Sequence, residues 1–327
     1  MAGKNMINVG EIDWLSHQLV GRSPEFEAVL NATNIISKLD VPVLLLGENG
    51  TGKELFARAI HNNSSRHDNN FVAINCAAIP EALFESELFG FRKGSFTHAE
   101  KNYDGKIRAA HNGTLFLDEI AELSLTSQAK LLRFLETSEC QSLGQQKCDT
   151  VNVRVIAATN QNLPELAGSN QFRKDLYYRL NVVPVNIPPL RERSGDIPML
   201  MEYFTHQFSN KHKLPAPKFD KAAIKQLTQY PWPGNVREAR NLCERMVVFH
   251  SGKSINPALL PPEILASGNG LSAFLNDTMS LAQHEKQLIN SALNAAKGNQ
   301  SKAARLLGIT RDTLIYRIKK YQIKQSL

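Results

Sequence analysis

The sequence has 327 residues, of which 42% are hydrophobic and 21% charged. This composition is typical of a folded chain of two or three domains, and it excludes collagen-like, fibrous and disordered classes. No apolar run reaches the roughly 18 residues that span a bilayer, and no secretory signal is recognisable, so no membrane insertion is expected. Four widely spaced cysteines without a CxxC pair argue against disulfides or zinc and favour a cytoplasmic protein.

The net charge of +7 is concentrated at one end of the chain. Residues 271–327 contain nine lysine and arginine side chains against three acidic ones, which leaves a charge of +1 for the other 270 residues. A compact basic module on a near-neutral body indicates a polyanionic partner.

The first two thirds of the chain alternate between strand-like and helix-like segments. This pattern predicts an α/β fold with a mostly parallel sheet and flanking helices. The expected strands are 41–46, 71–75, 114–118 and 151–158, and the expected helices include 54–61 and 127–136. After residue 193 the strands are expected to stop and helical periodicity to continue to about residue 251. A Gly/Ser/Asn-rich stretch then indicates a linker.

A glycine-rich string follows the first expected strand and opens a helix, which is the setting that a P-loop requires. Its backbone N–H groups and the helix N-terminus would face phosphate oxygens, and Lys53 would reach the β- and γ-phosphates of ATP. A simple glycine turn is the less favoured alternative. Glu54 stands where most P-loops have a hydroxyl ligand for Mg²⁺. The expected nucleotide-binding residues here are Gly47, Glu48, Asn49, Gly50, Thr51, Gly52, Lys53 and Glu54.

The string GTLFLDE at 113–119 is an apolar strand that ends in two carboxylates, the layout of a Walker B element. Asp118 would hold Mg²⁺, and Glu119 would polarise the attacking water. A strand ending in Asp-Glu is by itself more often a plain strand boundary. Together with the P-loop about 65 residues upstream, it predicts an ATPase.

Several long strings together resemble the AAA+ domain of the sigma-54-dependent transcriptional activators, the bacterial enhancer-binding proteins. They are GENGTGKE (47–54), NCAAIPEALFESELFG (75–90), GTLFLDEI (113–120), VRVIAATN (153–160), FRKDLYYRLNVVPVNIPPLRER (172–193) and YPWPGNVREARNL (230–242). The resemblance covers most of the chain. It implies residues 1–18 as an N-terminal extension, 19–193 as the α/β ATPase subdomain and 194–265 as its helical lid.

The resemblance also implies roles for individual residues. Val20 and Gly21 would line the adenine pocket, and Asn75 would hold Glu119 away from water until the site is engaged. Asn160 would sense the γ-phosphate, and Arg237 in the lid would be a second sensor. Arg173 and Arg179 would reach the ATP of a neighbouring subunit, so hydrolysis would need a homo-oligomeric ring, expected to be a hexamer. Without the resemblance, these two would be read as ordinary surface arginines.

The family touches sigma-54 RNA polymerase holoenzyme through a loop reading GAFTGA, and here the matching string is GSFTHA at 94–99. Phe96 and Thr97 are retained and would make the contact. His98 replaces a glycine, and a side chain there costs about 1 kcal/mol if the loop needs positive φ. A regulator that binds ATP and DNA but does not act through sigma-54 is therefore the alternative function.

The basic C-terminal segment reads as a helix-turn-helix. After a linker at 266–278, residues 279–327 predict three helices: a first behind a capping box at 280–283, a second over 301–307 and a third from Thr310 to about Tyr321. The string GNQSKAARLLGI (298–309) resembles the Fis-type domain that these activators carry. The expected contacts to double-stranded DNA are Ser301, Lys302, Arg311, Thr313, Arg317, Lys319 and Lys320.

The ATPase motifs begin close to residue 20, and this architecture resembles that of the phage-shock-protein operon activator, which lacks a sensory domain. We therefore expect regulation in trans by a separate protein. A third reading, a AAA+ unfoldase with a basic adaptor tail, is disfavoured by the Fis-like string.

Overall fold

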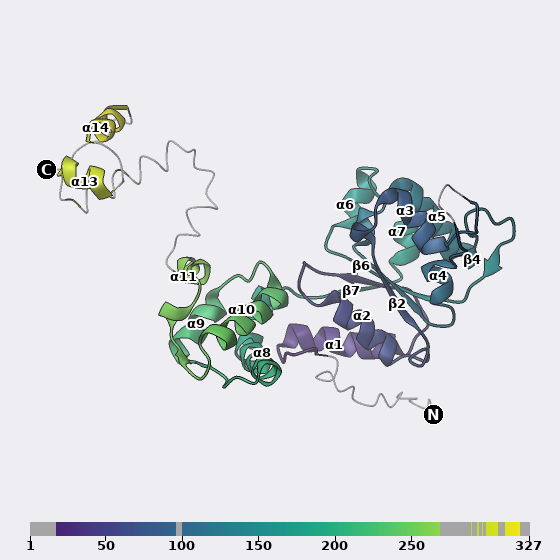
Figure 1. The fold of residues 1–327 in the computed structure, drawn as a ribbon, viewed down its shortest axis with the longest axis horizontal. Coiled ribbons are helices and arrows are strands. Elements are labelled where there is room, and N and C mark those ends of the chain that lie inside the picture. Colours follow the sequence, from purple (N-terminus) through teal and green to yellow (C-terminus); the bar gives the residue numbers. More distant parts are fainter. Residues whose placement is uncertain are drawn as a thin grey trace, which may run out of the picture. The chain divides into compact units, whose positions relative to one another are not determined.

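The computed structural model describes residues 18–95, 100–268, 299–306 and 311–320, together with Ile289, Leu293 and Ala296. The chain divides into two compact units, residues 1–265 and 266–327 (Figure 1). The larger unit contains a parallel sheet and a helical lid, and the smaller unit contains short helices. No helix in the described part of the chain is long and apolar enough to cross a membrane.

The central sheet has five parallel strands in the order β2-β3-β6-β1-β7. The strands are β1 (Val43–Leu46), β2 (Phe71–Asn75), β3 (Thr114–Asp118), β6 (Arg154–Thr159) and β7 (Val183–Asn186). Central strands of a parallel sheet are buried on both faces, which explains their continuous apolar runs. The predicted parallel α/β fold and the strands 71–75 and 114–118 are confirmed. The fifth strand, β7, was not predicted.

The strand expected at 151–158 starts later than the sequence suggested. Residues 149–150 form the short strand β5 (Asp149–Thr150), which pairs antiparallel with β4 (Glu139–Cys140). Val151 donates its N–H to the carbonyl of Ser138, so it still belongs to this hairpin. Residues 149–151 thus pair outside the central sheet, and β6 begins only at Arg154.

Helices cover both faces of the sheet (Figure 1). On one face, α1 (Pro24–Ser37) and α2 (Lys53–Asn62) pack their Phe26, Leu30, Phe56 and Ile60 side chains against alternate residues of β1 and β6. The other face is covered by α3 (Glu81–Phe89), α4 (Gly105–Ala109), α5 (Leu125–Thr137), α6 (Leu163–Gly168) and α7 (Lys174–Leu180). Successive side chains of a strand point to opposite faces, so each strand serves both cores.

The lid follows the 3₁₀ segment η3 (Leu190–Asp196). It consists of α8 (Ile197–His212), α9 (Lys221–Gln229), α10 (Asn235–Phe249) and α11 (Pro262–Gly268), packed around the fully buried Trp232. The expectation that strands stop after residue 193 was wrong in one detail. The two-residue strands β8 (Lys218–Phe219) and β9 (Ser254–Ile255) pair in parallel and join two lid loops.

In the smaller unit the structure describes α13 (Gln300–Leu306) and α14 (Arg311–Lys320), close to the expected second and third helices. Leu314 of α14 is fully buried and belongs to a small core with the residues Ile289, Leu293, Ala296, Ala303 and Ala304. The capping box at 280–283, the expected turn at 308–309 and most of the first helix lie outside the described residues.

Candidate active site

The phosphate loop lies between the carboxyl end of β1 and the first turn of α2, as the sequence predicts. Gly50 and Gly52 have φ values of +82° and +104°, a region that side chains other than glycine rarely adopt. A Cβ atom at Gly50 would come 2.3 Å from the carbonyl oxygen of Gly234. The Thr51 hydroxyl donates to the carbonyl of Glu48 at 2.8 Å and closes the turn. Both glycines are therefore required by the backbone, and the loop exposes N–H groups at a helix N-terminus, where anions bind.

Lys53 is the first residue of α2, and its side chain is only 7% exposed. The ammonium group donates to the carbonyl oxygen of Gly47 at 3.0 Å and lies 3.8 Å from Oε1 of Glu119. A buried ammonium between a loop carbonyl and a carboxylate is placed to exchange these partners for phosphate oxygens.

Asp118 ends β3, and Glu119 follows it in the left-handed conformation with φ +53°. The N–H of Glu119 donates to Oδ1 of Asp118 at 3.0 Å. Burial raises the pKa of the Asp118 carboxyl, and the positive charge of Lys53 and this hydrogen bond oppose the rise. The turn of the chain after Asp118 aims two neighbouring carboxylates at the phosphate loop.

The two motifs meet in one cavity of about 480 Å³, which we call the carboxylate cavity. It is lined from the α/β side by Asn49, Gly50, Gly52, Lys53, Glu54, Leu55, Asn75, Asp118 and Glu119, and from the lid by Phe204, Val236, Arg237 and Arg240. Sequence reasoning missed the lid residues Phe204, Val236 and Arg240, because nothing in the local sequence shows which face of a lid helix meets the phosphate loop.

Asn75 and Asn160 line two neighbouring cavities. Asn75 pairs in register with Asp118, and its side-chain oxygen accepts from the N–H groups of Ala77 and Ala78 at 3.0 and 3.2 Å. Asn160 directly follows β6 and lines a neighbouring hollow of about 360 Å³ with Gly47 and Glu48. The roles as switch and sensor stay predictions, with Asn75 inside the carboxylate cavity and Asn160 beside it.

The segment 18–21 borders both the carboxylate cavity and the core of the lid. Gln18 lines the carboxylate cavity. Val20 is 3% exposed and packs within the lid core, whereas Gly21 lies so close to Asp196 that a Cβ would come 2.5 Å from its Oδ2. The role of Val20 and Gly21 in the adenine pocket stays a prediction, and their visible contacts fasten this segment to the lid.

Arg173 and Arg179 are both exposed on α7 or at its start, and neither lines the carboxylate cavity. The guanidinium of Arg173 makes two hydrogen bonds to Asp175, at 3.1 and 2.7 Å. Arg179 donates twice to the carbonyl of Leu135, at 3.1 and 2.7 Å. In the described structure both guanidinium groups are thus bonded to groups of their own chain, and their role towards a neighbouring subunit stays a prediction.

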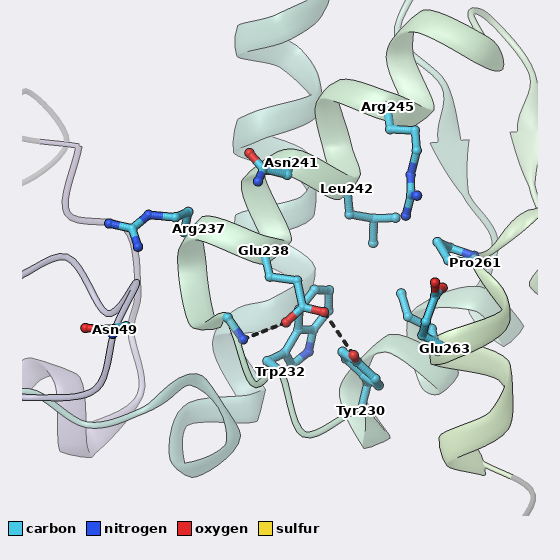
Figure 2. Close-up of a pocket in the computed structure, with 12 residues that line it drawn as sticks. Asn49, Tyr230, Trp232, Arg237, Glu238, Asn241, Leu242, Arg245, Pro261 and Glu263 are labelled. Carbon is cyan, nitrogen blue, oxygen red and sulfur yellow. Dashed lines mark hydrogen bonds between the residues drawn. The ribbon is translucent and has the colours of Figure 1, made fainter. Parts of the chain in front are cut away.

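A second hollow of about 510 Å³ lies on the lid beside the phosphate loop. Figure 2 shows Arg237 of this hollow directed towards the loop that carries Asn49, and Trp232 behind the Glu238 side chain. Glu238 accepts from the Tyr230 hydroxyl at 2.9 Å and from the Gly234 N–H at 2.8 Å (Figure 2). These two bonds fix the turn that carries Gly234 against the phosphate loop.

Phe96, Thr97 and His98 lie outside the described residues. The segments that flank them are held by Arg108, which donates to the carbonyls of Phe89, Asp104 and Cys140. The same guanidinium bonds twice to Asp149 of the β4–β5 hairpin, at 3.1 and 2.9 Å. Arg108 thus joins the base of the 94–99 loop to the hairpin.

The expected DNA-contacting residues lie on α13 and α14. Ser301, Lys302, Arg311 and Lys320 are exposed, and Thr313 and Arg317 are half-buried. Lys319 belongs to α14, and its side chain is outside the described residues. The cations Lys302, Arg311 and Lys320 are therefore accessible on α13 and α14.

Comparison with known families matches three segments that together make up most of this chain. Residues 19–186 match the Sigma-54 interaction domain, 191–273 the AAA+ ATPase lid domain, and 280–321 the Fis family of bacterial regulatory proteins. The chain belongs to the sigma-54 activator family. Membership makes the larger unit a nucleotide-binding AAA+ ATPase and the smaller one a Fis-type helix-turn-helix module.

Curated relatives of this chain are longer regulators. The phenol regulator MopR of Acinetobacter guillouiae is 43% identical over 97% of this chain and 58% of its own length. The transcriptional regulatory protein ZraR of Klebsiella oxytoca is 44% identical over 92% of this chain and 68% of its own length. This chain thus spans about three fifths to two thirds of these two proteins.

Solved structures agree with the architecture. NtrX from Brucella abortus, determined in complex with ADP, has a TM-score of 0.73 and 33% identity, and the match covers 94% of this chain and 69% of that one. A chain of S. cerevisiae Hsp104 in complex with casein shares 19% identity at a TM-score of 0.53, which shows a common AAA+ fold alone.

Proposed function

We propose that this protein is an ATP-driven activator of sigma-54-dependent transcription. It binds upstream double-stranded DNA through residues 279–327, assembles into a ring, expected to be a hexamer, and uses ATP hydrolysis to remodel sigma-54 RNA polymerase holoenzyme. The observation that carries the proposal is the single cavity in which Lys53, Asp118 and Glu119 meet, within a chain that matches both the sigma-54 and the Fis families.

The site fits ATP and Mg²⁺. The positive-φ glycines leave the loop backbone open to phosphate, and the buried Lys53 ammonium supplies the matching charge. Asp118 is the carboxylate that would hold Mg²⁺, with no hydroxyl available at Glu54. When bound, the ion neutralises charge that develops on the transferred phosphoryl group.

The chain's own residues then have separate roles in ATP hydrolysis. Lys53 orients the β- and γ-phosphates, Glu119 accepts the proton of the attacking water, and Asn75 restrains Glu119 before engagement. Asn160 and Arg237 sense the nucleotide, from the sheet and from the lid. Arg173 and Arg179 of a neighbouring subunit supply positive charge, which in other nucleotide hydrolases is worth about 10³–10⁵ in rate.

The contact with the transcription machinery is assigned to Phe96 and Thr97. Because they occupy the family's loop position, we place the sigma-54 contact there despite His98. A separate protein acting in trans is the expected regulator. The sigma-54-independent alternative rests on His98 alone, whereas the family match of residues 19–186 favours the activator.

The experiment is transcription from a sigma-54 promoter with purified holoenzyme. Wild-type protein should form open complexes only with hydrolysable ATP, and Glu119→Gln should bind ATP and DNA but form none. Open complexes formed by Glu119→Gln would refute a role for hydrolysis. Phosphate release by the wild type without open complexes would favour the sigma-54-independent regulator.

A further inference from the structure

The second residue of the phosphate loop, Glu48, is directed at the lid. Its carboxylate accepts two hydrogen bonds from Arg191, with Oε2 to Nη1 at 2.8 Å and Oε1 to Nη2 at 2.6 Å. A third comes from the side-chain amide of Asn235 at 3.1 Å. Glu48, Arg191 and Asn235 form a group that we call the lid clasp. Arg191 and Asn235 lie 143 and 187 residues from Glu48 in sequence, at the start of η3 and of α10.

Asn235 is the buried centre of the lid clasp. It is 0% exposed and adopts the left-handed conformation with φ +52°. Its amide also donates to the carbonyl of Asn49 at 3.1 Å, and its oxygen accepts from the Leu190 N–H at 2.8 Å. One side chain thus bonds to the phosphate loop and to the segment that enters the lid. Asparagine is among the few residues that combine this backbone conformation with both donor and acceptor.

The lid clasp adjoins the carboxylate cavity. Two residues after Asn235, the backbone N–H of Arg237 donates to the carbonyl of Gly50 at 3.2 Å. The Arg237 side chain lines the same cavity as Lys53 and Asp118. Three successive loop residues, Glu48, Asn49 and Gly50, are therefore bonded to the first turn of α10, which carries Arg237.

An exposed ion pair alone would not support a functional role. Glu48 and Arg191 are 42% and 45% exposed, and isolated pairs of this kind contribute little to stability. This pair differs because it is bidentate and because the Glu48 carboxylate also accepts a hydrogen bond from the fully buried amide of Asn235. The hydrogen bonds from Arg191 and then Asn235 also hold the pKa of Glu48 below its usual range, as expected for a carboxylate whose charged form is stabilised by these partners.

We propose that Glu48 is a positioning residue whose carboxylate, through Arg191 and Asn235, fastens the lid to the phosphate loop and thereby sets Arg237 over the nucleotide. The proposal rests on the nucleotide site proposed above and adds a device to it. Glu48 would act through the lid and not by touching phosphate, since its negative charge already faces Arg191. Loop and lid would then move as one when nucleotide enters or leaves.

The test uses the full chain with Glu48→Gln, Arg191→Gln and the matched control Glu244→Gln. Glu244 is also a lid carboxylate with two hydrogen-bonding neighbours, Lys211 and His212, each at 3.0 Å, but it does not line the carboxylate cavity. Two quantities are measured: binding of a fluorescent ADP analogue, and hydrogen exchange of the Arg237 amide, whose bond to Gly50 crosses from lid to loop. Urea midpoints confirm that each variant is folded.

Glu48→Gln and Arg191→Gln should each weaken ADP binding about fivefold and speed exchange of the Arg237 amide by a similar factor, at an unchanged urea midpoint. Glu244→Gln should change neither. In the Arg237→Ala background, Glu48→Gln should weaken binding no further, because the route through Arg237 is already lost.

Two results would overturn the proposal. If Glu48→Gln keeps the wild-type exchange rate of the Arg237 amide and the wild-type affinity for ADP, the lid clasp does not position Arg237. Losses that multiply in the Glu48→Gln/Arg237→Ala double variant would show that Glu48 acts on the nucleotide by another route. Failure of the wild-type protein itself to bind ADP would instead refute the proposed function.

Discussion

Gly50 of the phosphate loop lies directly against Gly234 of the lid, so close that a Cβ atom at Gly50 would come 2.3 Å from the Gly234 carbonyl oxygen. The contact leaves no room for a side chain between loop and lid. Gly234 has a constraint of its own, because a Cβ atom there would come 2.8 Å from the Cβ of Glu238.

We expect Gly50→Ala to destabilise the chain by about 2–4 kcal/mol, since the substitution adds a backbone clash to a positive φ. Gly94→Ala is the matched control, because Gly94 has the same φ of +82° but no atom of the described residues within 4 Å of an added Cβ. It should cost only about 1 kcal/mol. Urea unfolding measures both values. Equal losses at the two positions would mean that the contact with Gly234 is not tight.

The carboxyl of Asp40 gives a stability effect with a defined pH window. Hydrogen bonds from Arg66, at 2.9 and 2.7 Å, hold the pKa of Asp40 below its ordinary value. The folded state therefore binds this proton more weakly than the unfolded state, so the contribution of Asp40 is complete above about pH 4 and is lost as pH falls through the lowered pKa.

Asp40→Asn should accordingly lower the urea midpoint at pH 7, and its difference from wild type should close below pH 4. Asp68→Asn, at a carboxyl that is 88% exposed, should change the midpoint much less at pH 7. A difference for Asp40→Asn that stays constant down to pH 3 would show that the charge of Asp40 does not stabilise the fold.

Much of this architecture could be predicted from sequence, because its signals are local. The strands 71–75 and 114–118 are apolar runs that end at polar residues, and the loop between β1 and α2 is defined by its glycines and lysine. The boundary at Arg154 could not be predicted, since Val151 bonds to Ser138 in a hairpin that competes for the same residues. Likewise, β8 and β9 have two residues each, too few for a periodic pattern.

The motifs of the site could be predicted from the sequence, but the hydrogen bonds between its distant residues could not. Lys53, Asp118 and Glu119 were identified by their motifs, and the fold brings them together in one cavity. The bonds of Glu48 to Arg191 and Asn235 join residues more than 140 positions apart, and no local pattern encodes such a pairing. The strings PPLRER and PGNVRE held both partners, but only the three-dimensional structure shows what they contact.

Arg173, which precedes α7, and Arg179 on that helix should act on a neighbouring subunit. Arg173→Ala and Arg179→Ala should each lose ATP hydrolysis by about 10³-fold while binding ATP normally, because neither side chain lines its own cavity. Arg133→Ala, at another exposed arginine, is the control and should hydrolyse ATP normally. Mixing Arg179→Ala with Lys53→Ala should restore part of the phosphate release, since some mixed interfaces pair an intact loop with an intact arginine. No recovery from stable mixed rings would contradict action in trans.

DNA binding by the smaller unit should depend steeply on salt. If Arg317 meets a phosphate, Arg317→Ala should weaken binding and reduce the slope of log affinity against log salt by about 0.9. Arg305→Ala removes an equal charge from the end of α13 and should alter the slope less. Fluorescence anisotropy with a duplex measures both slopes, and an unchanged slope and affinity for Arg317→Ala would exclude that residue from the interface.

The central claim is that nucleotide chemistry in this cavity drives a contact with sigma-54. The most direct measurement is whether the purified protein, with ADP and a metal-fluoride mimic of the transferring phosphoryl group, forms a stable complex with sigma-54. We predict a complex that depends on the mimic and is lost in Phe96→Ala or Thr97→Ala. A protein that forms rings and hydrolyses ATP but gives no complex would contradict the claim and favour regulation independent of sigma-54.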